Sequence, residues 1–212
     1  MNDTIYSLTT FTDDYRDDYS SRARWVNALL GGSSRNSGQP GYKIPIDLSM
    51  AFHSDAGVTS NDSIVGTLSI YTRTSDGEIV YPHGGQRNIG REYADMVQSQ
   101  VVADIRATVE PRWSRRGIWD KSYHESRVPH VPAMLLELLS HQNFADMRYG
   151  LDPSFRFIVS RAVYKGMLKF LAYIGEADYV VQPLPVSSFA ADIEKGRVHL
   201  SWHCFRVIHV PF

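Results

Sequence analysis

The chain has 212 residues, with 22 Lys and Arg against 23 Asp and Glu, so its formal net charge is −1. A balance this close to zero gives no electrostatic reason to expect nucleic acid or an anionic membrane surface as a partner. The hydrophobic share of 43% excludes a disordered chain, and the single cysteine, Cys204, excludes both an intrachain disulfide framework and a zinc site built from several cysteines. The chain starts on an acidic, polar stretch unlike a secretory signal, and no apolar run approaches the roughly 20 residues of a membrane span.

The first half of the chain predicts strands on either side of a helix. Residues 4–11 can form a short strand. Residues 17–30 carry apolar side chains at helical spacing after a run of aspartates, which suits a helix N-terminus better than a metal site. Residues 46–53 alternate apolar and polar side chains, and residues 63–73 are rich in β-branched and aromatic residues, so both segments are predicted strands.

The second half alternates in the same way. Residues 91–110 show one apolar helical face, residues 111–130 are irregular and basic, and the apolar run at 131–139 suits a strand buried on both faces. Asp152 followed by Pro153 predicts the start of a last helix, which ends near Gly175. Strands alternating with helices predict an α/β domain over residues 1–176, with a central, mostly parallel sheet flanked by helices.

The composition changes after this domain. Residues 177–185 end in Pro-Leu-Pro and predict a linker. Residues 186–212 open with two short alternating segments around a Glu-Lys-Gly turn, which predicts the beginning of a second, all-β module.

Two residues in the predicted strands point to chemistry. His53 ends a predicted central strand, and ligand sites of open α/β sheets collect at the carboxyl ends of strands. Glu137 lies inside an apolar strand, where a carboxylate is costly unless it is paired, metal-linked or catalytic. The alternatives are a histidine bonded to the backbone and a glutamate paired with an arginine.

The segments around these residues resemble one enzyme family. LSMAFHSDAG at residues 48–57 resembles the S-x-H-x-N-A segment of the zinc-dependent N-acetylmuramoyl-L-alanine amidases, and RVPHVPAMLLEL at 127–138 resembles their L-R-x-x-x-x-P-A-V-L-V-E-L segment. The order of elements also fits over roughly residues 5–173. Large multidomain relatives in Bacteroidetes, some labelled xanthan lyase, are especially similar, and the tail resembles the first two strands of a fibronectin type III domain.

The resemblance implies a site and a reaction. The family holds zinc with two histidines and a glutamate and cuts the amide between N-acetylmuramic acid and L-alanine of peptidoglycan. It implies that His53 is a zinc ligand, that Glu137 is the general base and that Arg127 orients the glutamate or the substrate. His141 and Asp55 are the expected substrate-binding residues; Asp55 stands where the family usually has asparagine.

The same resemblance implies where the protein works and what it lacks. It implies a cell-envelope, periplasmic or secreted location and peptidoglycan as the partner. The family's first histidine and glutamate ligands precede the segment that contains His53, so the expected domain is one without its first strand and helix.

Other functions remain open on the sequence. The chain could be a non-catalytic cell-wall or glycan-binding module that keeps the sheet. A polysaccharide lyase could use Tyr123, His124 and Arg127. Trp113, Trp119 and Tyr123 lie among arginines and could bind glycan or peptide by stacking, although a loop packed over the sheet edge is the favoured explanation.

Overall fold

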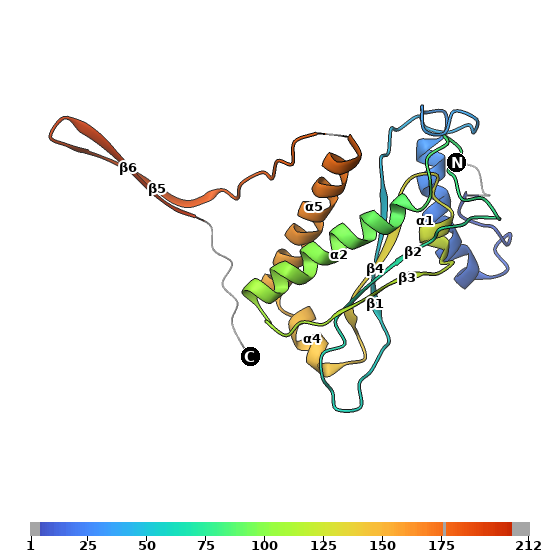
Figure 1. Ribbon diagram of the computed structural model, residues 1–212, viewed down its shortest axis with the longest axis horizontal. Helices are drawn as coiled ribbons and strands as arrows, with labels where there is room; N and C mark the ends of the chain where they lie inside the picture. Colours follow the sequence, from blue (N-terminus) through green and yellow to red (C-terminus); the bar gives the residue numbers. More distant parts are fainter. Residues whose placement is uncertain (1–4, 176, 205–212) are drawn as a thin grey trace.

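The computed structural model describes residues 5–175 and 177–204. In chain order its elements are α1 (Asp14–Leu30), β1 (Ser49–Asp55), β2 (Thr67–Tyr71), α2 (Ile89–Thr108), β3 (Arg115–Asp120), α3 (His124–Arg127), β4 (Ala133–Ser140), α4 (Phe144–Gly150), α5 (Pro153–Gly175), β5 (Val186–Glu194) and β6 (Arg197–Cys204). Figure 1 shows a helix-flanked sheet followed by a hairpin that projects away from it.

The central sheet has four strands in the order β1-β4-β2-β3. β1 runs parallel to β4 and β2 runs parallel to β3, whereas β2 and β4 are antiparallel. The prediction of an α/β fold with a mostly parallel central sheet is therefore confirmed. β4 is buried along its length except for one partly buried position, Glu137, as expected for a strand covered on both faces.

The two faces of the sheet have different covers. On one face α2 and α5 pack against each other and against the strands, around the fully buried side chains of Tyr93, Phe155 and Phe170. Met50 of β1 points into this main core, whereas its neighbour Ala51 packs on the opposite face against Leu68, Ile70 and Leu135. On that second face α3 contacts β1 and β4, and α1 packs against α3.

The helix starts follow local capping chemistry. Asp13 caps α1 by accepting a hydrogen bond from the backbone N–H of Arg16 at 3.0 Å. The carboxylate of Asp152 accepts from the N–H of Ser154 at 2.8 Å just before α5, which confirms the predicted helix start. No described helix is long and apolar enough to cross a membrane.

Two predictions of local structure are wrong. Residues 5–11 form turns instead of a strand, because Asp17 accepts hydrogen bonds from the N–H and the hydroxyl of Thr9, each at 2.8 Å, and ties this segment to α1. Residue 4 lies outside the described residues. Residues 111–130 are not irregular throughout, since they contain β3 and α3. β3 shows little apolar alternation because most of its side chains are exposed or partly exposed.

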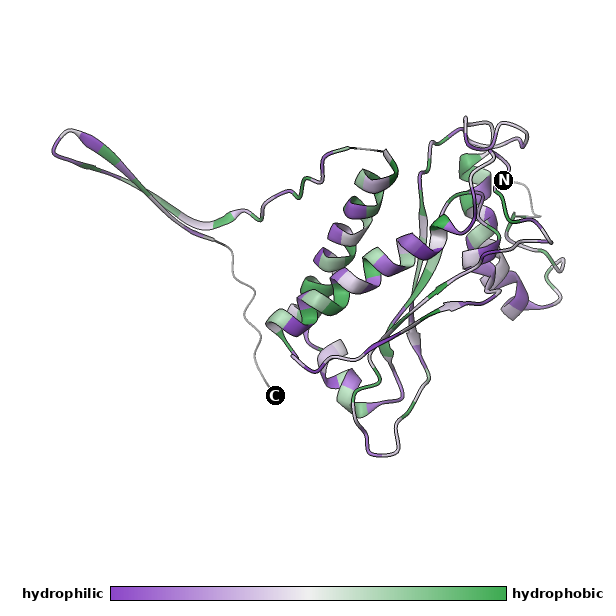
Figure 2. Ribbon diagram, in the orientation of Figure 1, coloured by the Kyte–Doolittle hydropathy of each residue, from purple (hydrophilic) through white to green (hydrophobic). Residues whose placement is uncertain are grey.

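The tail contains the predicted pair of strands. β5 and β6 pair antiparallel around Lys195 and Gly196, whose φ values of 49° and 78° fit a tight hairpin turn. Phe189 faces Trp202 and Ile193 faces Val198, so the apolar side chains share one side of the ribbon; the hydropathy alternates along both strands in Figure 2. Residues 177–185 have no regular element. The fibronectin-like assignment and the domain boundaries stay predictions, and residues 205–212 lie outside the described residues.

Candidate functional site

His53 and Glu137 lie side by side on the second face of the sheet. β1 and β4 are parallel, and His53 is the register partner of Glu137; on its other side Glu137 is the register partner of Leu68 of β2. Register partners point to the same face, and Ala51, two residues before His53, packs on the face away from α2 and α5. The structure therefore brings together the two residues that the sequence singled out.

The carboxyl group of Glu137 is held in an unusual environment. It is partly buried, and its Oε2 atom is sealed from solvent without a hydrogen-bond partner among the described residues. Burial raises the pKa of Glu137; the negative charge of Asp55 adds to this effect, while the positive charges of His53 and Arg116 oppose it. A carboxyl group whose pKa is raised above its ordinary value, and which lacks a hydrogen-bond partner among the described residues, is suited to accept a proton.

His53 is paired with a residue that sequence reasoning did not assign to the site. Its Nε2 lies 3.0 Å from Oε1 of Glu125, on α3, and the same oxygen accepts a hydrogen bond from Nη1 of Arg22, on α1, at 2.8 Å. Arg22 also forms an ion pair with Asp18 one helical turn earlier. The hydrogen bond to Glu125 raises the pKa of His53 despite its partial burial. Burial alone would raise the pKa of Glu125, but the hydrogen bonds from His53 and Arg22 outweigh it and lower that pKa.

A second charge pair borders the site on its other side. Asp55, two residues after His53, accepts a hydrogen bond from Nη1 of Arg116 of β3 at 2.6 Å. Burial would raise the pKa of Asp55, but the Arg116 hydrogen bond and the N–H of Ala56 lower it. The guanidinium of Arg116 lies 5.6 Å from the ring centroid of Trp119. Asp55, predicted to bind substrate directly, thus uses its carboxylate to hold Arg116.

The strand that carries His53 separates two hollows. One, about 360 Å³, is lined by Arg22, Glu125 and His53 together with residues of β1. The other, about 480 Å³ and more apolar, lies toward α4 and α5 and includes His141. The Nδ1 atom of His141 lies 3.1 Å from the hydroxyl of Ser54. Ser54 alternates with His53 along β1, so His141 lines the hollow on the face opposite Glu137.

Arg127 does not reach Glu137. Its guanidinium lies 3.4 Å from a carboxylate oxygen of Asp76, in the loop before α2, and its backbone carbonyl accepts a hydrogen bond from Arg87 at 2.8 Å. The arginine that influences Glu137 electrostatically is Arg116 instead.

The donors around His53 do not make a zinc site by themselves. Within residues 5–175 and 177–204, no group of three or more His, Cys, Asp or Glu side chains could hold a metal ion. His53 and Glu125 are the donors that meet here, and the Glu125 oxygen is shared with the cationic Arg22. A catalytic zinc needs three protein ligands, so the described residues alone do not fit one.

The aromatic residues among the arginines have separate roles. Trp113 is fully buried, and its indole N–H donates to the hydroxyl of Thr67 at 2.9 Å, so it belongs to the core. Trp119 and Tyr123 are exposed over roughly two fifths of their surface and remain available to a ligand.

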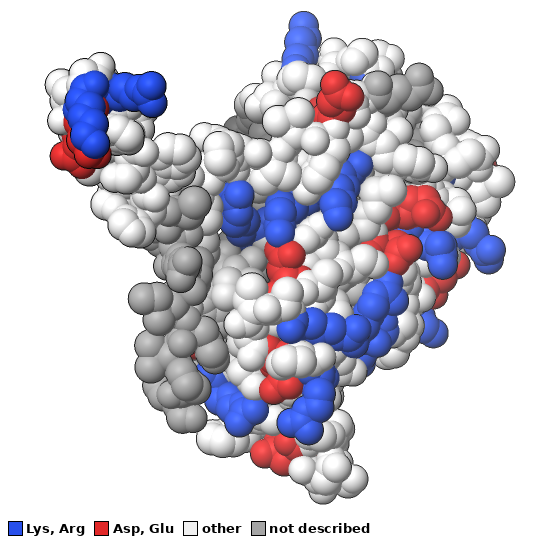
Figure 3. Space-filling model, turned by 60° about the vertical axis from the view of Figure 1, so that its left-hand side comes forward, with Lys and Arg blue, Asp and Glu red and all other residues white. Residues whose placement is uncertain are grey.

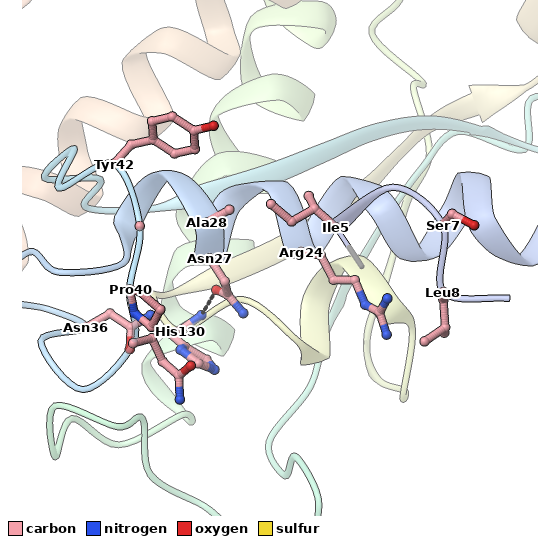
Figure 4. Close-up of a pocket in the computed structure, with 12 residues that line it drawn as sticks. Ile5, Ser7, Leu8, Arg24, Asn27, Ala28, Asn36, Pro40, Tyr42 and His130 are labelled. Atoms are coloured by element: carbon pink, nitrogen blue, oxygen red, sulfur yellow. Dashed lines mark hydrogen bonds between the residues drawn. The ribbon is translucent and has the colours of Figure 1, made fainter. Parts of the chain in front are cut away.

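A larger cavity lies on another side of α1. It measures about 830 Å³, is open to solvent, and is lined by residues of α1, of the N-terminal segment and of the loop that follows α1, together with His130. Figure 4 shows Asn27 of α1 accepting a hydrogen bond from the backbone N–H of His130, at 2.9 Å, at one end of this cavity. It shares no lining residue with the hollow at His53, so this larger cavity and the candidate chemistry do not coincide.

Charges of both signs lie on the face of the molecule that Figure 3 presents. Figure 3 shows basic and acidic side chains interspersed on the face turned forward, in agreement with the net charge of −1. Recognition at this site therefore depends on local groups more than on the overall field.

Comparison with known proteins identifies the fold. No protein-family model matches the chain, and no curated protein sequence matches it. Among solved structures, the N-acetylmuramyl-L-alanine amidase Ami1 of Mycobacterium smegmatis matches with a TM-score of 0.52 at 16% identity, over 73% of this chain and 61% of that one. The CwlD amidase of Clostridioides difficile, solved in complex with the GerS lipoprotein, matches with a TM-score of 0.52 at 15% identity, over 79% of this chain and 68% of that one. The chain therefore has the fold seen in N-acetylmuramoyl-L-alanine amidases.

Proposed function

We propose that this domain acts on peptidoglycan as a hydrolase of the N-acetylmuramoyl-L-alanine amide bond. The observation that carries the proposal is Glu137, an unpartnered and partly buried carboxyl group beside His53 on adjacent strands of an amidase-type sheet. The substrate would place the protein at the cell envelope, in the periplasm or outside the cell.

Glu137 supplies the base that this hydrolysis needs. Its carboxylate takes a proton from a water molecule, and the water oxygen bonds to the carbonyl carbon of the lactyl amide. The carbon–nitrogen bond then breaks, and the proton passes to the departing nitrogen, giving a lactyl carboxylic acid and a free alanine amine. His53, fixed by Glu125, and Arg116, fixed by Asp55, border the place where this amide would lie.

Zinc is the cofactor that the family resemblance assigns to this reaction. When bound, it would polarise the amide carbonyl and lower the pKa of the attacking water. His53 stands where the family resemblance places a zinc ligand, but the described donors do not complete a zinc coordination site. Zinc dependence is thus implied by the resemblance alone, and activity must be measured both with added zinc and with a chelator.

A second candidate function is binding of peptidoglycan without turnover. It is favoured by the contact between His53 and Glu125, which uses the imidazole Nε2 in an ion pair shared with Arg22. A domain of this kind would keep the sheet and the two hollows at β1 but would not carry out metal-dependent hydrolysis.

Digestion of purified muropeptides followed by mass spectrometry tests the proposal. We expect release of intact stem peptides by the wild-type chain and none by Glu137→Gln. Arg115→Gln is the matched control and should retain activity. Arg115 forms an ion pair with Asp95 of α2, with 2.5 Å between their N and O atoms, and α2 covers the other face of the sheet from Glu137. Cleavage within the peptide or the glycan would contradict the proposal, and an unsaturated sugar product absorbing in the ultraviolet would indicate a lyase instead.

Sedimentation with insoluble peptidoglycan separates the two candidates. Retention of the chain with no product, with or without added zinc, favours the binding module. Retention together with release of stem peptides favours the hydrolase.

A further inference from the structure

The strand β3 departs from regular pairing at one point, next to the site. Thr67 of β2 pairs with Arg115, but Ser69 pairs with Ile118, so Arg116 and Gly117 together stand opposite the single residue between them, Leu68. An extra residue of this kind bends a strand and redirects a side chain, and such irregularities occur often beside active sites.

The irregularity is fixed from the opposite side of the sheet. Gln98 of α2 is fully buried, and its Nε2 donates to the carbonyl of Thr67 at 2.9 Å and to the carbonyl of Arg116 at 3.0 Å. These bonds satisfy carbonyl groups on both strands at the point where the register shifts. The position of Arg116 is therefore built into the fold and is not a chance conformation of an exposed side chain.

Arg116 completes a row of side chains across the sheet. His53 is the register partner of Glu137, Glu137 is the partner of Leu68, and Leu68 stands opposite the shifted residues of β3. Glu137 thus lies in a row between a histidine on one edge strand and the backbone of Arg116 on the other, and the guanidinium of Arg116 reaches over this row to Asp55 of β1. The buried Leu68 forms the apolar floor between Glu137 and Arg116.

The guanidinium of Arg116 is held by one side chain and keeps further N–H groups available for a ligand. Nη1 donates to Asp55 at 2.6 Å, and within the described part of the chain no other side chain accepts a hydrogen bond from it. The Arg116 side chain is 22% exposed, and the adjacent Trp119 is 43% exposed. A planar guanidinium with free N–H groups beside an open aromatic ring is suited to bind a carboxylate on a peptide.

The distance between Glu137 and the Arg116 guanidinium indicates which carboxylate of the stem peptide Arg116 would bind. The Arg116 side chain reaches back across the sheet to Asp55, which lies two residues, roughly 7 Å, beyond His53, the register partner of Glu137. An extended peptide advances about 3.3–3.6 Å per residue, so a group two residues beyond an amide at Glu137 would arrive at Arg116. Resting on the proposed function, we propose that Arg116 binds the free α-carboxylate of the second stem residue and makes the domain selective for stems in which that carboxylate is not amidated.

Calorimetry with two small ligands tests this selectivity. The ligands are N-acetylmuramoyl-L-alanyl-D-glutamate, which has the α-carboxylate, and N-acetylmuramoyl-L-alanyl-D-isoglutamine, in which it is an amide. We expect the chain with Arg116 unchanged to prefer the first by about tenfold, the effect of one charge-assisted hydrogen bond. Because the proposed hydrolase would cleave both ligands, every chain in these titrations, including the one with Arg116 unchanged, carries Glu137→Gln, and mass spectrometry of the ligand after each titration confirms that it is intact.

Three variants assign the preference to the arginine. Arg116→Gln should bind the two ligands equally, and Arg116→Lys should keep part of the preference because the charge remains but the fork is lost. Arg115→Gln, the neighbouring control, should keep all of it. Circular dichroism and thermal unfolding confirm that each variant is folded.

The outcomes separate this inference from the function on which it rests. If the chain with Arg116 unchanged binds both ligands equally, or if Arg116→Gln keeps the preference, the role of Arg116 is overturned while muropeptide digestion still decides the hydrolase. If neither ligand binds, Arg116 selectivity is overturned; absence of digestion products then overturns the hydrolase separately.

Discussion

Oε1 of Glu125 lies 3.0 Å from Nε2 of His53, and this contact joins α3 to the carboxyl end of β1 across 72 positions of the chain. Because Arg22 donates to the same oxygen at 2.8 Å, the carboxylate links both helices on this face of the sheet to the histidine. The orientation of the imidazole is therefore set by tertiary contacts and not by the strand alone.

The His53–Glu125 pair should stabilise the fold most between the ordinary pKa values of the two groups. The pKa of His53 is raised above 6.5, so its contribution is fully present below that value and is lost as the pH rises through the raised pKa. The pKa of Glu125 is lowered below 4.5, so its contribution is present above that value and is lost as the pH falls through the lowered pKa. Urea unfolding of Glu125→Gln should show the largest loss of unfolding free energy between these two limits. Glu92→Gln, at an exposed ion pair with Arg91, is the control that should change little.

The ionised carboxylate of Glu137 should lower the stability of the fold, in contrast to the His53–Glu125 pair, which raises it. Burial raises its pKa above 4.5, so the folded state binds the proton more tightly than the unfolded state does, and the carboxyl group costs stability as the pH rises through the raised pKa. Glu137→Gln should therefore gain thermal stability relative to the wild type at alkaline pH and lose that advantage near pH 4, while its hydrolytic activity is abolished. In the wild type, activity should rise with pH through the same raised pKa. A variant less stable than the wild type at every pH would show that the carboxylate is a structural partner.

The two tryptophans near β3 should separate stability from binding. Trp113→Ala should destabilise the fold by about 3–5 kcal/mol, because the ring is fully buried and its N–H is bonded to Thr67. Trp119→Ala should change stability by no more than about 0.5 kcal/mol but weaken muropeptide binding. Chemical unfolding and calorimetry measure the two effects, and equal destabilisation by both variants would place Trp119 in the core instead.

Zinc binding gives a direct check on the donor set. Because the described residues contain no group of three or more suitable donors, we expect the chain to retain less than one equivalent of zinc after loading and dialysis against zinc-free buffer. Metal analysis by mass spectrometry measures this, with His53→Ala in parallel. One tightly held equivalent in the wild type that is absent from His53→Ala would mean that donors outside the described residues complete the site.

The sequence predicted those parts of the structure that depend on local chemistry. The Asp-Pro start of α5, the apolar run of β4 and the turn between β5 and β6 carry their signals within a few residues. β3 carries none, because its pairing with β2 and the bonds from Gln98 are long-range. His53 and Glu137 could be recognised as polar groups in predicted strands.

The partners of these residues could not be predicted in the same way. Glu125 and Arg116 lie 72 and 61 positions from the side chains that they contact, and no spacing rule connects them. Arg127, chosen on a local motif, pairs with Asp76 instead. The borders of the site are defined by long-range side-chain pairs, which a local sequence motif does not reveal.

The buried amide of Gln98 has a consequence for how this domain could change its preference. It ties a carbonyl at the ligand face to α2, and α2 packs so closely on α5 that a Cβ at Gly166 would lie 2.7 Å from Cα of Val97. Replacing Gly166 with a larger residue would displace α2, the helix whose Gln98 bonds to the backbone carbonyl of Arg116. Substitutions at the α2–α5 contact could thus change the ligand selectivity of Arg116 without altering any residue that contacts the ligand.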